Sequence, residues 1–322
     1  MVLPVNRRRF VVAAGALVVA PSALARRLGG APVALVTADL ESHVVAVEIS
    51  TGRVLRRIET RPGPRSIESS LATIAVVAHT EYGALTLLDG RSLRVVSVLE
   101  GVTEPRYTAA DRTGRYAYVS DSKRGEVVVL DLPRRKIVGR VALDGPARHL
   151  SLAPNGRALW VSLGTKAKRI AVVGLDRPAR PRLATTIAPP FLAHDVGFAP
   201  DGSAVWVTSG DRGSLALYDA RTHRLRRRLD ADAAPQHVTF IGGRAYVTSG
   251  DDGSLRVHAT GGQLLHTASV PRGSYNVQQG FGELLTPSLE TGTLCIVSRA
   301  GRVLRTKRVA RSSHDACFVI AA

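Results

Sequence analysis

The residues from His194 to Leu229 form a unit of four short strands, predicted from the alternation of apolar and polar positions. The four runs cover residues 195–199, 204–208, 214–218 and 224–229. Turn residues such as Pro200, Asp201 and Gly202 separate the runs. Apolar or β-branched side chains at period two, bounded by Gly, Pro and Asp, are typical of β-strands. The unit is therefore predicted to be an antiparallel meander of four strands.

The same unit repeats along the chain. Its first strands begin near Ser66, Tyr107, His149, Asp195, His237, Tyr275 and Asp315, which are 41, 42, 46, 42, 38 and 40 residues apart. A period near 40 residues with four strands in each copy indicates the blade of a β-propeller. A single meander cannot bury both faces of its sheet, whereas neighbouring blades in a ring can.

The two ends of the chain are predicted to complete one blade together. Residues 33–58 hold only the second, third and fourth strands of a unit, and residues 315–320 hold only a first strand. Joining them ties the ring and removes its free radial edge. The sequence thus predicts an all-β, seven-bladed β-propeller with four-stranded antiparallel blades.

The second strands carry a recurring motif. They read YVTS at 246–249, WVTS at 206–209, YVSD at 118–121 and WVSL at 160–163. In these residues the chain resembles the YVTN-repeat β-propellers, from residue 33 to the C-terminus. The resemblance implies an exported, bacterial-type propeller. Related propellers include lactonases, a streptogramin lyase and the haem d1 domain of nitrite reductase, but no motif here places the chain in a catalytic group.

Residues 1–25 have the features of an export signal. Three arginines at positions 7–9 precede an apolar stretch over 10–20, and Ala23-Leu24-Ala25 fits a small-x-small cleavage site. The run NRRRFVV favours the twin-arginine route, with an ordinary secretory signal or an uncleaved anchor as alternatives. We expect an exported protein, periplasmic or extracellular, with residues 26–322 as a single propeller domain.

The chain is strongly basic, with a formal charge of +18 that becomes +15 once the three arginines of residues 1–25 are removed. The basic residues gather in and before fourth strands, as in residues 53–57, 134–136, 221–228 and 302–308. One interpretation is a solvated rim that prevents edge-to-edge aggregation. The other is contact with an anionic cell surface. Nucleic acid is a poor fit, because no aromatic platform accompanies the arginines.

The two cysteines are expected to be free. Cys295 lies in a predicted third strand and Cys317 in the first strand of the next blade. Cysteines in an exported protein can pair, but two positions inside strands favour buried thiols.

Residues at the start of each first strand are predicted to surround the central opening on one face of the ring. The pairs are Arg65 and Ser66, Arg106 and Tyr107, Arg148 and His149, His194 and Asp195, Gln236 and His237, Ser274 and Tyr275, and His314 and Asp315. The loops from second to third strands add His43 and His79 to this face. Most of these positions are polar, titratable or aromatic, where a structural filler would be Val, Ile or Ala.

Three interpretations of this mouth stay open. In the first, Arg65, Arg106 and Arg148 converge on a carboxylate or phosphate, with Tyr107 and Tyr275 beside an organic ligand. In the second, neighbouring imidazoles bind a divalent metal or a haem. That set is His149, His194, His237 and His314, with Asp195 and Asp315 as ligands or as their partners. In the third, the mouth is polar only because it faces water.

The leading hypothesis for function is therefore a binding or scaffold protein for an anionic small molecule or a protein partner. One alternative is a metal-assisted, lactonase-like hydrolase or a lyase, for which Glu68 and Glu104 are available as bases. Another is a redox propeller that binds haem or a metal. The segments GDRG at 210–213 and GDDG at 250–253 are interpreted as hairpin turns rather than calcium sites. Residues 175–190 are expected to form a rigid, proline-bearing excursion.

Overall fold

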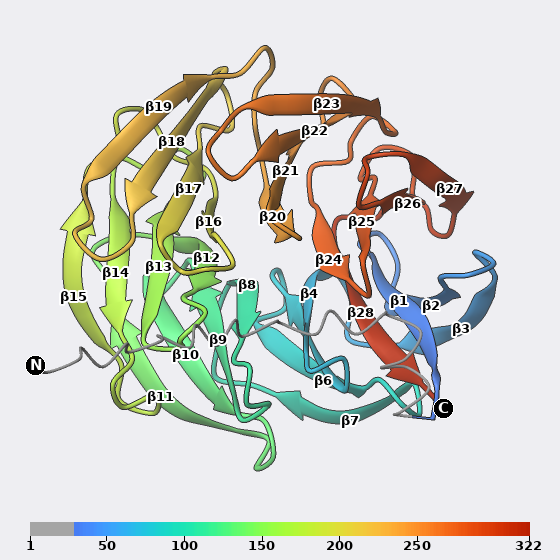
Figure 1. The fold of residues 1–322 in the computed structure, drawn as a ribbon. Helices are drawn as coiled ribbons and strands as arrows, with labels where there is room; N and C mark the ends of the chain where they lie inside the picture. The colour runs from blue at the N-terminus through green and yellow to red at the C-terminus, as the bar shows by residue number, and fades with distance from the viewer. Residues whose placement is uncertain (1–28) are drawn as a thin grey trace, which may run out of the picture.

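The computed structural model describes residues 29–322 and shows a closed ring of seven blades (Figure 1). All of its regular elements are β-strands, β1 to β28, and each blade is an antiparallel sheet of four. The predicted fold class is confirmed. The export segment expected at 1–25 lies outside the described residues, so that expectation stays a prediction.

Six blades consist of consecutive strands, and each blade is named by its first strand. Three of them contain β4 (Pro64–Ser70), β5 (Ile74–His79), β6 (Ala84–Asp89) and β7 (Arg94–Leu99); β8 (Pro105–Ala110), β9 (Tyr116–Asp121), β10 (Glu126–Asp131) and β11 (Lys136–Ala142); and β12 (Ala147–Leu152), β13 (Ala158–Leu163), β14 (Ile170–Gly174) and β15 (Arg182–Ile187). The other three contain β16 (Val196–Phe198), β17 (Ala204–Thr208), β18 (Ser214–Asp219) and β19 (Leu225–Asp230); β20 (Val238–Ile241), β21 (Arg244–Ser249), β22 (Ser254–Ala259) and β23 (Leu264–Ser269); and β24 (Gln278–Gly280), β25 (Glu283–Pro287), β26 (Thr293–Ser298) and β27 (Val303–Arg308).

The seventh blade closes the ring with both ends of the described chain. It has the strand order β28 (Ala316–Ala321), β1 (Ala31–Ala38), β2 (His43–Glu48) and β3 (Val54–Glu59). The pairing of β28 with β1 runs from Ala31 opposite Ala321 to Val36 opposite Ala316. Closure by three N-terminal strands and one C-terminal strand is as the sequence predicts.

One prediction about an element is wrong. Residues 175–190 are not an excursion outside the sheet, because β15 (Arg182–Ile187) within them is the fourth strand of its blade. Its side chains are mostly exposed and it has no clear apolar alternation, since an outermost strand packs little against neighbouring blades. Its pairing with β14 alone makes it a strand.

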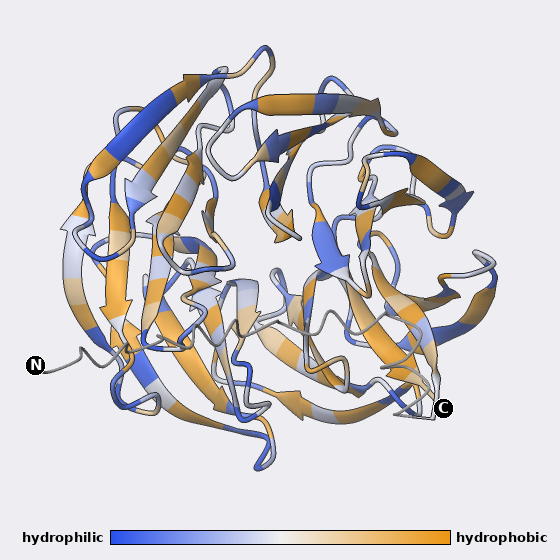
Figure 2. Ribbon diagram, viewed as in Figure 1, coloured by the Kyte–Doolittle hydropathy of each residue, from blue (hydrophilic) through white to orange (hydrophobic). Residues whose placement is uncertain are grey.

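The apolar core lies between blades. Middle strands such as β10 and β14 are largely hydrophobic in Figure 2, whereas the inner strand β24 is hydrophilic. Trp160 of β13 packs against Phe198 and Tyr218 of the next blade, and Trp206 of β17 packs against Phe240 of the blade after that. Both indole side chains are fully buried. Burying large aromatic groups between sheets supplies much of the hydrophobic stabilisation that joins one blade to the next.

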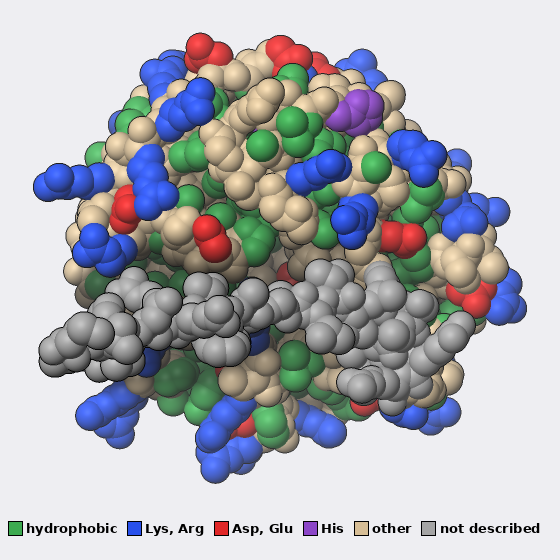
Figure 3. Space-filling view, viewed as in Figure 1, with side chains coloured by type: hydrophobic (Ala, Val, Ile, Leu, Met, Phe, Trp, Pro, Cys, Tyr) green, Lys and Arg blue, Asp and Glu red, His purple; other side chains and the backbone are tan. Residues whose placement is uncertain are grey.

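The fourth strands form an exposed basic rim. Arg226, Arg227 and Arg228 of β19 are exposed, and Figure 3 shows Lys and Arg side chains around the perimeter of the molecule. The rim satisfies the expectation of solvated outer strands, whereas contact with an anionic surface stays a prediction. Residues 29–322 contain no helix that could cross a membrane. Cys295 and Cys317 are both buried and free, as expected.

A hydroxyl near the end of the second strand fixes the backbone at the start of the first strand. In five blades a Ser or Thr side chain accepts a hydrogen bond from the amide opposite it. The amides belong to Tyr107, His149, Asp195, His237 and Asp315. This contact explains the recurring Ser or Thr of the second-strand motif, because it holds each residue that faces the axis in one position.

This contact predicts a stability difference between two buried threonines. The Thr208 hydroxyl accepts from the Asp195 amide at 3.0 Å and donates to the Gln236 carbonyl at 2.6 Å. The equally buried Thr286 hydroxyl has no oxygen or nitrogen partner among the described residues, and the weakly bonding Cys295 thiol lies opposite it. Thr208→Val should lower the free energy of unfolding by about 1–3 kcal/mol, because it leaves buried polar groups unpaired. Thr286→Val, the control, should leave it unchanged or raise it. Denaturant titrations giving equal losses would contradict the role of the hydroxyl.

Candidate functional site

Two stacked rings of residues surround the axis at the mouth. The inner ring consists of the residues opposite the third position of the second-strand motif: Ser66, Tyr107, His149, Asp195, His237, Asn276 and Asp315. The outer ring consists of the residue before each of these: Arg65, Arg106, Arg148, His194, Gln236, Tyr275 and His314. Six of the seven predicted starts belong to the inner ring.

The prediction for the β24 blade is wrong by one residue. The pairing of Gln278 with Leu285 places Asn276, not Tyr275, at the inner ring. The second-strand motif there reads LTPS at 285–288, so that Pro287 stands at the third position, where five other blades have the hydroxyl. Tyr275 belongs instead to the outer ring, where it still lines the mouth.

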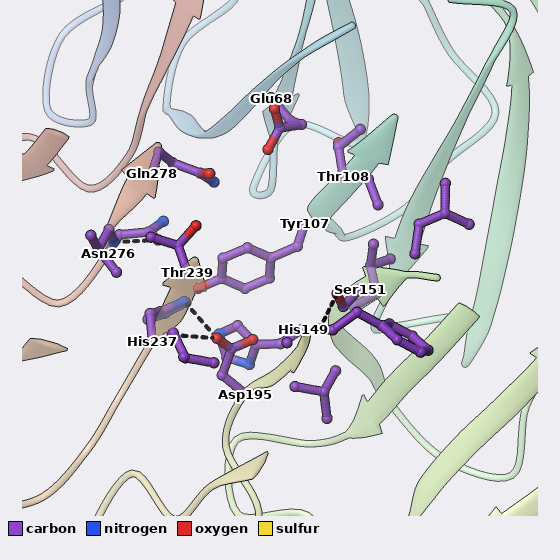
Figure 4. Close-up of a pocket in the computed structure, with 18 of the residues that line it drawn as sticks. Glu68, Tyr107, Thr108, His149, Ser151, Asp195, His237, Thr239, Asn276 and Gln278 are labelled. Carbon is purple, nitrogen blue, oxygen red and sulfur yellow. Dashed lines mark hydrogen bonds and ion pairs between the residues drawn. The ribbon is translucent and has the colours of Figure 1, made fainter. Parts of the chain in front are cut away.

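The inner ring divides the axis into two cavities. The outer chamber, about 350 Å³, is lined by Arg65, Arg148, Lys166, His194, Asp211, Gln236, Tyr275 and His314 among others. The inner chamber, about 300 Å³, is lined by Glu68, His149, Asp195, Asn276 and Gln278 among others. Tyr107 and His237 line both chambers. The two cavities therefore meet at a layer of rings (Figure 4).

Three histidines from three consecutive blades meet in this layer. The ring centroids of His149 and His194 are 4.4 Å apart, those of His149 and His237 are 4.7 Å apart, and those of His194 and His237 are 5.5 Å apart. One ring nitrogen from each lies within 4.8 Å of the others. Tyr107 stacks on His149 at 4.1 Å and extends the layer towards His314 at 6.1 Å.

The hydrogen bonds of these rings differ. The Nδ1 atom of His194 lies 3.1 Å from the Thr165 carbonyl, and that of His314 lies 3.0 Å from the Arg65 carbonyl. The Nδ1 atom of His237 lies 3.5 Å from a carboxylate oxygen of Asp195, as Figure 4 shows. A ring nitrogen that faces a carbonyl carries the proton, so the other nitrogen, Nε2, keeps a free lone pair. His149 is buried with neither nitrogen bonded to any described residue.

Burial keeps the four histidines of the mouth uncharged at neutral pH. It lowers the pKa of His194 to about 4, although the Thr165 carbonyl raises it. It holds the pKa values of His149, His237 and His314 well below the usual range, and neighbouring positive groups lower them further. Neutral imidazole has a free lone pair, so it is the form that binds metals.

The three mouth arginines do not act as one group. Arg65 pairs with Asp39 at 2.9 Å, and Arg106 pairs with Glu104. Arg106 lines a separate cavity of about 740 Å³ rather than the outer chamber. Arg148 has no ion pair among residues 29–322. Burial lowers its pKa, and the nearby charges of Arg106 and Arg65 lower it further.

The two aspartates of the inner ring connect neighbouring blades. Asp195 accepts a hydrogen bond from the Val238 amide at 3.0 Å, and Asp315 accepts one from the Ile67 amide at 3.0 Å. Burial raises the pKa of Asp195 to about 7 and that of Asp315 well above its usual range, while these amides oppose the shift. Asp195 contacts Nδ1 of His237 and is not one of the three residues, His149, His194 and His237, whose possible metal-binding atoms lie close together.

Two glycines of the predicted turns are needed for packing at the mouth. Gly210 has a φ of +73° and touches the His194 side chain so closely that a Cβ would lie 2.6 Å from it. At Gly250, whose φ is not positive, a Cβ would lie 2.4 Å from the Tyr275 ring. These turns therefore set the positions of two outer-ring side chains as well as reversing the chain.

The loops between second and third strands supply some residues of the outer chamber, but not the two histidines expected on the mouth face. His43 and His79 do not line either chamber, and both nitrogens of His79 are bonded, to the Pro62 carbonyl and the Thr86 hydroxyl. Lys166 and Asp211, paired at 3.2 Å in the outer chamber, were not singled out. Both come from loops between second and third strands, which emerge on the mouth face, so their position was the available signal.

Glu68 is one of two acids that line the inner chamber, the other being Asp195, and it is half-buried. Burial raises its pKa to about 7 from 4.5, although the Ser69 amide and Gln278 side chain donate hydrogen bonds to it. Asp315 and Cys317 are its titratable neighbours. Between pH 4.5 and 7 the folded chain holds a proton that the unfolded chain has lost. Stability from this group is therefore lost as the pH rises through that window.

Glu68→Gln should remove this pH dependence. Between pH 5 and 7 the free energy of unfolding of the wild type should fall relative to that of the variant, by up to about 1.4 kcal/mol per pH unit. Above pH 8 the difference between the two should stay constant. Urea titrations at each pH measure the difference, with the exposed Glu59→Gln as a control. A difference that stays constant with pH would show that Glu68 is ionised throughout.

Comparisons with known proteins identify the fold. No protein-family profile matches the sequence, and no curated protein matches it. A functionally unknown protein from Desulfotomaculum acetoxidans has a TM-score of 0.78 at 13% identity, over 90% of this chain and 99% of that one. Hydrazine synthase from Kuenenia stuttgartiensis has a TM-score of 0.66 at 15% identity, over 80% and 89%. Dihydro-heme d1 dehydrogenase NirN, in complex with DHE, has a TM-score of 0.63 at 14% identity, over 86% of this chain and 64% of that one.

These likenesses, at such low identity, concern the fold alone. Together with the closed ring of seven four-stranded sheets, they define the chain as a seven-bladed β-propeller. What such a ring binds depends on the residues at its axis, because one fold carries many functions.

Proposed function

We propose that the chain is an exported, ligand-binding β-propeller whose outer chamber binds a small anionic molecule. The observation that carries this proposal is Arg148 in the chamber wall, whose positive charge has no ion-pair partner among the described residues. A half-buried guanidinium without a carboxylate partner is costly, and a bound carboxylate or phosphate would relieve that cost with paired hydrogen bonds.

The charges around the chamber favour a ligand with few negative charges. Asp39 neutralises Arg65, and Asp211 neutralises Lys166. His194, His237 and His314 are uncharged. The net charge left for a ligand is therefore close to the single charge of Arg148, which matches one carboxylate or one phosphate group.

The size and the lining of the chamber favour a small organic acid. Its volume of about 350 Å³ is near the lower end for ligand pockets. Tyr107 and Tyr275 offer aromatic faces to the non-polar part of such a molecule. The Tyr275 hydroxyl donates to Asp251 at 2.8 Å, which fixes that ring at the chamber wall.

Two further features support the wider assignment. The signal-like residues 1–25 favour export to the periplasm or the exterior. The second-strand hydroxyls that hold five inner-ring amides supply a structural reason for the Ser or Thr of a YVTN-type repeat. We therefore assign the repeats to that type as part of the proposal.

Replacing Arg148 should abolish anion binding. Thermal unfolding of the wild type with rising acetate, lactate or inorganic phosphate should show a concentration-dependent increase in Tm for at least one of them. Arg148→Met should lose this increase, because it removes the free charge but keeps much of the side-chain volume. Arg106→Met is the matched control, since Arg106 pairs with Glu104 outside the chamber.

An unchanged response of Arg148→Met would contradict the proposal, as would an equal loss in Arg106→Met. Sodium chloride at matched ionic strength separates specific binding from screening.

A further inference from the structure

We propose that His149, His194 and His237 form a binding site for one divalent transition-metal ion of the zinc class, at the floor of the outer chamber. The inference rests on the geometry of the histidine layer and stands independently of anion binding at Arg148. The three residues come from consecutive blades, and one ring nitrogen of each lies within 4.8 Å of the others.

The three ring nitrogens can bind one ion if they move slightly closer to each other. Three nitrogens bound to one zinc ion at about 2.0–2.1 Å lie about 3.3 Å from each other. The hydroxyls of Ser162 and Thr248 hold the amides of His149 and His237, and Thr208 holds the amide of the residue that follows His194. Closure would therefore have to come from rotation of the rings about their side-chain bonds.

His149 supplies the second, independent observation. Its side chain is 1% exposed, and neither ring nitrogen has a hydrogen-bond partner among the described residues. A buried polar group without a partner costs about 1–3 kcal/mol. In a well-packed protein such a group calls for a reason, and a metal ion coordinated by one of its nitrogens provides one.

The other two rings are oriented as metal ligands usually are. His194 presents Nδ1 to the Thr165 carbonyl, and His237 presents Nδ1 to the Asp195 carboxylate. Each therefore turns a free Nε2 away from its supporting oxygen. Support of one ring nitrogen by a carbonyl or a carboxylate fixes the tautomer in which the other nitrogen can bind a metal.

The donor set selects the kind of metal. Three imidazoles suit zinc, copper, nickel or iron, whereas magnesium and calcium require oxygen ligands. Three protein ligands also leave a coordination position open, as in catalytic rather than structural zinc sites. His194 and His237 both line the outer chamber, so that open position is accessible from the mouth.

A purely structural layer of stacked rings is the competing explanation. In that case Tyr107 and His149 would serve as a hydrophobic plug, and His149→Phe would preserve both packing and any response to metal. If the site binds metal, His149→Phe keeps the fold but loses the response. His314 is the matched control, because it lies in the same mouth but its Nδ1 bonds to the Arg65 carbonyl and it is not part of the close group.

The test uses the full chain, carrying an affinity tag without histidines and stripped of metal by a chelator that is then removed. Titration with zinc chloride by calorimetry should give one equivalent bound per chain, and cobalt chloride should give visible absorption bands. Magnesium and calcium should give no binding. His149→Phe, His194→Ala and His237→Ala should each weaken zinc binding at least about a hundredfold, because even supporting partners contribute 10–100-fold.

Asp195→Asn should weaken zinc binding by up to about 10–100-fold. The carboxylate oxygen that faces His237 Nδ1 also accepts from the Val238 amide, so the Asn oxygen can keep both contacts but supports the ring as a neutral and weaker acceptor. His314→Ala should bind zinc as the wild type does. Arg148→Met should bind zinc at least as tightly as the wild type, because it removes a positive charge close to the three histidines, so metal binding and anion binding can each fail separately. Circular dichroism confirms that each variant is folded, and if one ligand variant is unfolded the other two decide. The absence of saturable zinc binding in the wild type, or an equal loss in His314→Ala, would overturn the proposal.

Discussion

The pairing of the last strand with the first is the constraint on which the rest of the structure depends. The hydrogen bonds between β28 and β1 turn a row of seven meanders into a closed ring. Only in a closed ring do the seven first strands converge on one axis. Once they do, the residues at the starts of these strands come close together, and in five blades the hydroxyl opposite holds the backbone in place. The mouth is therefore a consequence of closure, and its chemistry is set by single residues, one from each blade.

Most of the architecture could be predicted because it repeats. The spacing of the strand starts, the split blade and the buried free cysteines all follow from patterns that recur or from simple counting. Prediction failed where a blade departs from the repeat. Pro287 replaces the usual hydroxyl and shifted the alignment of Tyr275 by one residue. The strand β15 lacks apolar alternation because it lies at the outer edge of its sheet.

The site was predicted by position but not by charge. The sequence places Arg65, Arg106 and Arg148 at equivalent points, and nothing in that periodicity reveals that Asp39 and Glu104 neutralise the first two. Nor does it show which of the mouth histidines come together, since that depends on side-chain direction. The structure separates a cationic outer chamber from an inner chamber whose lining has two acids, Glu68 and Asp195, and no Lys or Arg. The histidine layer lies where the two chambers meet, so a metal ion there and an anion at Arg148 would be neighbours.

The most direct test of this account is an anomalous diffraction experiment on crystals of the full chain grown with zinc chloride and a small carboxylic acid. The account predicts one anomalous peak at the zinc edge among His149, His194 and His237. It also predicts density for a carboxylate in the outer chamber, between that peak and the Arg148 guanidinium. An empty histidine layer, with zinc bound only at surface residues, would contradict the central claim that the ring gathers these three imidazoles in order to bind an ion.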